Sequence, residues 1–370
     1  MLTTECNLEC KYCFGEAIED FEEDFNASDI DYSLPKTINY NYDVLNEFCS
    51  KDPNCVLTFY GGEPLLKQQD LRKIMDRVIA RFFMIQTNGL LLDRLSPIYV
   101  NRFHTILISM DGNEDITNYY RGKDTYEKII NNLKVIKRNN FNGELIARMT
   151  VMEKTDIHKQ VKWLLENDDL RFSSVHWQLN AGFWGSDYKR RNFISWSKNS
   201  YIPGIKKLVE YWIEHMGSEY EVLKIYPFLG IANSLLFGEK KSFLRCGGGW
   251  INYTIQTDGQ IIPCPTMWGM KKYYLGNIRN SNPLKLKKIH IKLPPCVDCD
   301  TIDLCGGRCL YANITKRWSK KSYEQVCINV RELIKAIKKE IPRIQHMIKS
   351  RKIKLSDFEY IKYNGCEIIP

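Results

Sequence analysis

The chain has 370 residues, 44% of them hydrophobic and 12% aromatic, and a formal net charge of +9. This composition is that of a globular protein with room for one large domain and a smaller one. No apolar run approaches the roughly eighteen residues of a membrane span, and five residues precede Cys6, so we expect no membrane segment and no signal peptide. In a protein expected to be cytoplasmic, thirteen cysteines are more typical of metal binding than of disulfides.

The first chemical signal is segment 6–13, which we name the cysteine loop. Cys6, Cys10 and Cys13 follow one another at spacings of four and three. Three thiolates at these spacings can ligate three irons of one cubane iron–sulfur cluster, and the fourth iron then has no protein ligand and is a place for chemistry. The alternative is a zinc knuckle, which needs a fourth Cys or His nearby, and no such residue follows before Cys49.

Strand-like and helix-like segments alternate as far as residue 179. Strands are expected at Met1–Thr4, Val56–Tyr60, Phe82–Gln86, Thr105–Ile108, Glu144–Val151 and Val175–Leu179. Helices are expected at Tyr42–Cys49, Gln69–Arg81, Leu91–Asn101, Tyr126–Asn139 and Ile157–Glu166. This alternation predicts an α/β fold with a parallel sheet and right-handed crossovers.

Polar motifs stand at the carboxyl ends of these strands, which form the active-site rim in barrel-like α/β folds. The cysteine loop follows the first strand, and three later strands end in the motifs Gly61-Gly62-Glu63-Pro64, Thr87-Asn88-Gly89 and Ser109-Met110-Asp111-Gly112. Four polar motifs at one rim are not expected of chance turns. We therefore expect them to form one site.

The residue types at this rim suit an amino acid joined to a nucleoside. Glu63 offers a carboxylate to an ammonium group, and the two glycines before it permit close backbone approach. Arg121 or Arg148 can hold a carboxylate. The predicted S-adenosylmethionine site comprises these residues and the other rim residues Tyr12, Gly61, Gly62, Pro64, Thr87, Asn88, Ser109 and Asp111, with Ser109 and Asp111 for the ribose and Tyr12 for the adenine.

The order of these motifs resembles the radical S-adenosylmethionine (radical SAM) superfamily. The resemblance rests on Cys-x3-Cys-x2-Cys after a first strand, then Gly-Gly-Glu-Pro, then Ser-x-Asp-Gly. It implies a partial (β/α)6 TIM-like barrel. It also implies that the open iron passes one electron to S-adenosylmethionine and that the resulting 5′-deoxyadenosyl radical takes a hydrogen from the substrate.

A second set of seven cysteines begins at Cys246 and resembles the C-terminal SPASM domain of peptide- and protein-modifying radical enzymes. The resemblance implies two auxiliary [4Fe–4S] clusters, hence three in all. By motif position, the first would be held by Cys246, Cys264 and Cys309, and the second by Cys296, Cys299, Cys305 and Cys327. The alternative is a pair of structural zinc sites.

Two departures from the sulfatase-maturing members of the family matter. No cysteine follows Cys246 within Gly247-Gly248-Gly249-Trp250-Ile251-Asn252, so the first auxiliary cluster has an open iron, a water or a distant ligand such as Cys49, Cys55 or Cys366. Cys264 is followed by Pro265-Thr266, where those enzymes place an Asp base. The second departure argues against formylglycine formation.

We expect four regions, with the radical SAM barrel at 1–182, a bridge at 183–243, the SPASM domain at 244–330 and a basic helical tail at 331–370. Helices are expected in the bridge at Ile202–Met216 and Pro227–Phe237, and in the tail at Ile328–Lys349 with a kink at Pro342. Residues 16–31 carry eight acids and no Lys or Arg, and residues 316–354 carry thirteen basic against three acidic residues. These runs are either solvated surfaces or surfaces for a peptide or protein partner.

The sequence thus predicts a radical enzyme that modifies a ribosomal peptide or a protein, by crosslinking, thioether formation or oxidation. The expected partners are that substrate and an external one-electron reductant of the flavodoxin or ferredoxin type. No recognition domain is expected before Cys6, so recognition of the peptide falls to the bridge, the tail or a separate peptide-recognition protein. Nucleic acid is not expected, since no matching motif is present. The alternatives are a radical enzyme acting on a small metabolite or free amino acid, and a non-catalytic iron–sulfur electron carrier.

Overall fold

The computed structural model describes residues 1–13, 29–167, 170, 172–182, 187–239, 244–290 and 294–362. The chain divides into two compact units that interleave along the sequence. Unit 1 comprises residues 1–148, 167–172 and 248–289, and unit 2 comprises residues 149–166, 173–247 and 290–370. The four predicted regions stay a prediction. Most of the acidic run at 16–31 lies outside the described residues.

The main sheet has five strands in the order β1-β2-β3-β4-β5, and the pairs from β1 to β4 are parallel. The strands are β1 (Val56–Phe59), β2 (Phe82–Thr87), β3 (Phe103–Ser109), β4 (Glu144–Val151) and β5 (Ser174–Leu179). β3 is buried on both faces, as its run of isoleucine and leucine predicts for a parallel strand. Five of the six predicted strands are confirmed. The sixth, Met1–Thr4, forms only isolated bridges from Thr3 to Thr37 and Gly61.

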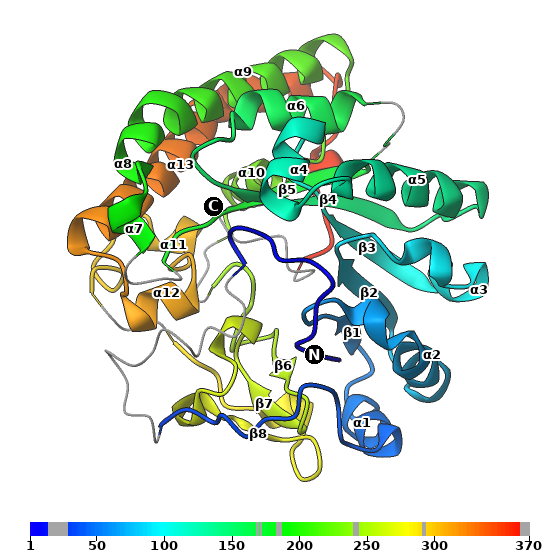
Figure 1. Cartoon of the computed structure of the whole chain (residues 1–370). Coiled ribbons are helices and arrows are strands. Elements are labelled where there is room, and N and C mark those ends of the chain that lie inside the picture. The colour runs from blue at the N-terminus through cyan, green and yellow to red at the C-terminus, as the bar shows by residue number, and fades with distance from the viewer. Residues whose placement is uncertain are drawn as a thin grey trace. The chain divides into compact units, whose positions relative to one another are not determined.

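Helices follow the strands of unit 1 in the predicted alternation. They are α1 (Tyr42–Cys49), α2 (Gln68–Arg77), α3 (Pro97–Val100), α4 (Glu114–Arg121) and α5 (Thr125–Arg138), and Figure 1 shows α2, α3 and α5 on the same side of β1 to β3. The helix predicted at Leu91–Asn101 is wrong in length. A 3-10 turn comes first, and Pro97 then starts α3 as a new helix, because proline fits the first turn of a helix and disfavours the helical conformation at the residue before it. α4 was not predicted, although Asn113 caps its first turn.

Unit 1 also contains a small antiparallel sheet formed by β6 (Thr254–Ile255), β7 (Gln260–Ile262) and β8 (Gly276–Asn277). Gly259 joins β6 to β7 with a φ of +91°, a conformation that glycine adopts without strain. The amino group of Met1 donates a hydrogen bond to the Ile255 carbonyl at 2.6 Å. Cys264 lies two residues after β7 and therefore has a fixed strand leading into it.

Unit 2 is mainly helical. Its helices are α6 (Ile157–Glu166), α7 (Asp187–Arg190), α8 (Phe193–Trp196), α9 (Ile202–Ser218), α10 (Tyr226–Phe237), α11 (Ile302–Cys305), α12 (Leu310–Thr315) and α13 (Lys320–Lys349). α13 packs against α9 and α10, and Figure 1 shows α9 and α13 running side by side. The bridge helices are confirmed within two residues at each end. No described helix is long and apolar enough to span a membrane.

The tail helix starts earlier than predicted. Ser319 caps α13, because its hydroxyl accepts a hydrogen bond from the Ser322 amide, and the helix then runs thirty residues through Pro342. The spacing of apolar residues in the sequence predicted that this helix starts at Ile328. The earlier start places Cys327 inside a regular helix rather than before it.

Pro342 is exposed inside α13 and provides a test of this continuity. Pro342→Ala should stabilise the protein by about 1–3 kcal/mol, because alanine restores the helical N–H and removes the clash of the proline ring with the preceding turn. Urea unfolding measures the change. Lys338→Ala, an exposed change in the same helix, should stay within about 0.5 kcal/mol. No gain from Pro342→Ala would contradict a continuous helix.

Candidate active site

The segment that leads into the cysteine loop lies against the end of β1. The amide of Gly62 donates to the Thr3 carbonyl and the amide of Glu63 donates to the Glu5 carbonyl, both at 2.8 Å. Leu2 donates to the Tyr60 carbonyl at 2.9 Å. These bonds place the first residues of the loop at the rim that the sequence predicted.

Gly61 and Gly62 are needed because the two backbones are so close. A Cβ at position 61 would lie 2.1 Å from the Thr3 carbonyl oxygen, and a Cβ at position 62 would lie 2.2 Å from the Glu5 carbonyl oxygen. No side chain fits at such distances. The glycine pair therefore admits the chain that carries the cysteines.

Glu63 is buried and connects several residues of this rim through hydrogen bonds. Its side chain is fully buried and accepts hydrogen bonds from the Leu65 amide at 2.9 Å, the Thr87 hydroxyl at 2.8 Å and the Asn88 amide at 2.7 Å. Burial raises the pKa of the carboxyl, and the three donors act in the opposite direction. Glu63 thus joins the end of β1 to the end of β2. The Pro64 that follows begins a 3-10 turn.

The motif after β2 holds the cysteine loop by a side chain. The Asn88 amide group donates to the Asn7 side-chain oxygen at 2.8 Å. Its own oxygen accepts from the Leu90 amide at 3.0 Å, which fixes the Asn88 rotamer. Asn7 lies directly after Cys6, so this bond positions the first cysteine. The sequence analysis assigned no role to Asn7, because a single asparagine in a loop carries no pattern.

The motif after β3 holds the other end of the loop. Asp111 is fully buried and pairs with Arg121, whose Nε and Nη2 each donate to one carboxylate oxygen at 2.9 Å. The Tyr12 hydroxyl donates to the same carboxylate at 2.6 Å. The Lys11 amide donates to the Tyr120 carbonyl on α4 at 2.9 Å. The missed helix α4 therefore carries both Arg121 and a backbone anchor of the loop.

These contacts show which of the predicted site residues already use their hydrogen-bonding groups within the protein. Both oxygens of Asp111 are engaged, and the Arg121 guanidinium is 6% exposed and already paired. Ser109 and Arg148 are half-buried and stand beside each other in the register of β3 and β4. The structure thus brings the rim motifs together, and it shows that Asp111 and Arg121 already hold the loop.

The three thiols of the loop differ in exposure. Cys6 and Cys13 are exposed and Cys10 is half-buried, and the turn between the last two is closed by a bond from the Cys13 amide to the Cys10 carbonyl. Burial raises the pKa of Cys10 to about 11, and the nearby Arg121 acts against this shift. Throughout the described residues, no three Cys, His, Asp or Glu side chains lie close enough to share one metal ion. Ligands of one zinc lie roughly 3.8 Å apart, whereas cubane ligands stand further apart.

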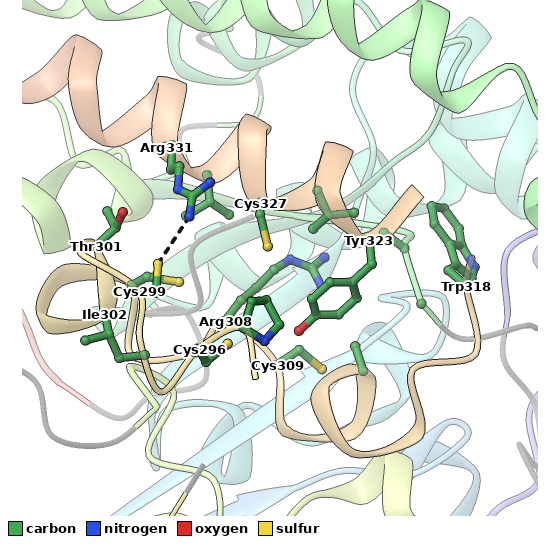
Figure 2. A pocket seen from close by; sticks show the side chains of 18 residues that line it. Cys296, Cys299, Thr301, Ile302, Arg308, Cys309, Trp318, Tyr323, Cys327 and Arg331 are labelled. Atoms are coloured by element: carbon green, nitrogen blue, oxygen red, sulfur yellow. Dashed lines mark hydrogen bonds between the residues drawn. The ribbon is translucent and has the colours of Figure 1, made fainter. Parts of the chain in front are cut away.

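A second site lies within unit 2. Cys296, Cys299, Cys305 and Cys327 line one pocket, together with Cys309 (Figure 2). The space that these residues line measures about 680 Å³, part of which is open solvent. The four cysteines that the sequence analysis grouped are thus together, although Cys327 comes from α13 and the others from the segment before it.

The remaining cysteines are distributed over both units. Cys264 belongs to unit 1, and Cys246 and Cys309 belong to unit 2. Cys264 contacts the Thr266 hydroxyl at 3.1 Å. Cys49 and Cys55 form a hydrogen bond with each other, which raises the pKa of Cys49 and lowers that of Cys55. Cys366 lies outside the described residues.

Residues 1–161 match the family model of the radical SAM superfamily. The chain contains a radical SAM domain. Such a domain uses S-adenosylmethionine and a [4Fe–4S] cluster, and the loop and rim described above fit both.

Two curated relatives extend the likeness beyond the radical SAM domain. The chain is 25% identical to a cysteine-type anaerobic sulfatase-maturating enzyme of Clostridium perfringens over 351 residues, which cover 88% of this chain and 92% of that protein. It is 22% identical to the radical SAM cyclopropyl synthase TigE of Paramaledivibacter caminithermalis, over 87% of this chain and 69% of TigE.

Solved structures share the fold. Native anSMEcpe with bound AdoMet superposes with a TM-score of 0.70 at 20% identity, over 94% of this chain and 98% of that one. Streptococcus suis SuiB bound to precursor peptide SuiA gives a TM-score of 0.53 at 13% identity, over 85% and 71%. The predicted α/β class is therefore confirmed.

Gly62 tests the close approach in the radical SAM domain. Gly62→Ala should destabilise the protein by about 1–3 kcal/mol, because the new methyl group must push the Glu5 carbonyl away. It should also lower the iron content after reconstitution, since the cysteine loop moves with Glu5. Gly217→Ala is the control, because nothing lies within 4 Å of a Cβ there. Equal iron and equal urea midpoints in both variants would show that the approach is not needed.

Asp111 tests the buried ion pair. Asp111→Asn should cost about 3–5 kcal/mol in the free energy of unfolding, because Arg121 is left as a buried charge without its partner. Asp115→Asn is the matched control on the exposed first turn of α4 and should change stability by about 0.5 kcal/mol or less. Chemical denaturation measures both. A small effect of Asp111→Asn would mean that Arg121 has another anion.

Proposed function

We propose that this chain is a radical SAM enzyme that modifies a residue of a ribosomal peptide or of a protein. The observation that carries the proposal is the anchoring of the cysteine loop by the polar motifs at three strand ends, through Thr3 and Glu5, Asn7, and Tyr12. An electron carrier needs its cysteines held, but it needs no polar rim beside them. When bound, S-adenosylmethionine and the cluster supply a 5′-deoxyadenosyl radical that abstracts a hydrogen from the substrate.

Different residues of the rim have different roles in binding S-adenosylmethionine. We assign the carboxylate of its methionine part to Arg148, which lies in β4 beside the end of β3, or to Arg121. We assign a ribose hydroxyl to Ser109, which neighbours Arg148 in the sheet. Glu63, Thr87 and Asp111 support the site from beneath, since their polar atoms already hydrogen-bond within the protein.

A peptide or protein substrate is supported by the relatives. One is named as a sulfatase-maturating enzyme, and a structural neighbour was solved with its precursor peptide bound. The reaction outcome differs from formylglycine formation in our proposal, because Cys264 is followed by Pro265-Thr266 rather than by an acidic base. Crosslinking, thioether formation and oxidation are the outcomes that remain. The external reductant and a separate recognition protein complete the proposed partners, and the proposed location is the cytoplasm.

Two auxiliary clusters are part of the proposal. The pocket lined by Cys296, Cys299, Cys305 and Cys327 supports the second of them. We assign Cys246, Cys264 and Cys309 to the first, with an open fourth position. Cys49 and Cys55 are the weaker candidates for that position, because each already interacts with the other.

Reciprocal cysteine variants test the function. Reconstituted anaerobically, the wild type should hold about twelve irons and form 5′-deoxyadenosine with dithionite, if all three clusters are [4Fe–4S]. Cys10→Ala should keep about eight irons and lose all 5′-deoxyadenosine, because the iron that meets S-adenosylmethionine is gone.

The matched variant is Cys305→Ala, which removes a ligand of the second auxiliary cluster. It should also lose about four irons but still cleave S-adenosylmethionine. Iron analysis and chromatography of the nucleoside provide the two measurements. If the iron-loaded wild type forms no 5′-deoxyadenosine, the chain is not a radical SAM enzyme.

A further inference from the structure

The lining of the pocket in unit 2 is cationic. It contains the side chains of Arg308 and Arg331 beside the five cysteines and no Asp or Glu, although Asp300, outside the lining, has its Oδ1 3.8 Å from the Cys299 sulfur. Four thiolates outweigh the charge of an iron–sulfur core, so such a cluster is an anion, and its reduction adds one more negative charge. Cations and hydrogen-bond donors at the ligand sulfurs therefore favour the reduced form over the oxidised form.

Arg331 donates directly to a ligand sulfur. Its Nη2 lies 3.4 Å from the Cys299 sulfur, and Figure 2 shows the guanidinium reaching from α13 to that cysteine. Arg331 follows Cys327 by one helical turn, so the same face of α13 supplies one ligand and a cation for another. Cys299 itself lies in a tight turn, where its amide donates to the Cys296 carbonyl at 3.2 Å.

Asn313 donates to a second ligand sulfur. Its Nδ2 lies 3.0 Å from the Cys296 sulfur, and its side chain is fully buried on α12. Its Oδ1 is buried and accepts no hydrogen bond from any residue that the structure describes. A buried amide with an unpaired oxygen is unfavourable for folding. The hydrogen bond from its N–H group to the Cys296 sulfur explains why an asparagine is present at this buried position.

We propose that Arg331 and Asn313 raise the reduction potential of the auxiliary cluster held by Cys296, Cys299, Cys305 and Cys327. This inference rests on the proposed function, which assigns that cluster. The couple takes up one electron into the core, with no proton and no bond made or broken at the two residues. Each residue acts by stabilising the extra negative charge on the sulfur to which it donates. The cluster is thereby a better electron acceptor than it would be without these two donors.

A potentiometric titration of the reconstituted full-length protein tests the proposal, with dithionite as reductant and the electron paramagnetic resonance signal of each reduced cluster as readout. The signal that disappears in Cys299→Ala identifies the cluster. Arg331→Gln should shift the midpoint of that signal to a more negative potential, with the iron content unchanged. Asn313→Leu, which keeps the side-chain volume but removes the donor, should shift it the same way.

Lys335→Gln is the matched control, because it removes a positive charge one turn further along the same helix from a residue that does not line the pocket. It should leave the midpoint where it is in the wild type. Equal midpoints for Arg331→Gln and Lys335→Gln at full iron content would overturn the proposal, even if Asn313→Leu fails to fold. If Cys299→Ala removes neither iron nor a signal, the cluster assignment itself is wrong. If the iron-loaded wild type forms no 5′-deoxyadenosine but the midpoints shift as expected, only the proposed enzyme function is wrong.

Discussion

The ion pair between Asp111 and Arg121 is the interaction on which the cysteine loop depends most. Both side chains are buried, and the carboxylate also accepts a hydrogen bond from the hydroxyl of Tyr12, which lies between two of the cysteines. A loop without regular structure has many conformations, and ordering it costs roughly 1–2 kcal/mol for each residue. Contacts with side chains that are themselves fixed in the core offset that cost. The loop therefore owes its place at the rim to residues far from it in the sequence.

The other two anchors follow the same logic with neutral groups. Gly61 and Gly62 let the chain before Cys6 pair with the end of β1, and Asn88 holds Asn7. Glu63 connects these two anchors, because it binds the amide of Asn88 and the hydroxyl of Thr87. Three successive strand ends thus hold three successive parts of one loop, and the thiols themselves remain exposed or half-buried.

Much of this arrangement could be predicted from the sequence, for physical reasons that differ between elements. β2 and β4 are rich in apolar residues, as buried strands are, and their predicted ends are correct within one residue. The positions of the rim motifs followed from the strands, because parallel strands end at the same edge. The roles of Glu63 and Asp111 could not be predicted in detail. Their residue types suit a ligand and a buried hub equally well, and only burial and partners distinguish the two.

The elements and residues that the sequence did not predict have a common cause. α4 has only eight residues and begins with the acidic residues Glu114 and Asp115, and α13 begins with the basic residues Lys320 and Lys321, so neither start carried a hydrophobic signal. Arg331 and Asn313 were not singled out, because nothing in the sequence says which polar side chain of a helix turns toward a sulfur. Such pairings arise from tertiary packing and not from spacing along the chain.

The position of Cys327 inside α13 has a consequence for how unit 2 is made. Cys296 and Cys299 lie in a segment with little regular structure, whereas Cys327 lies in a thirty-residue helix that packs against α9 and α10. A cluster that binds all of them ties a loose segment to a rigid helix, and the free energy of binding iron becomes free energy of folding. In the proposed holoprotein, the supply of iron and sulfide would then set how much of unit 2 is fully folded.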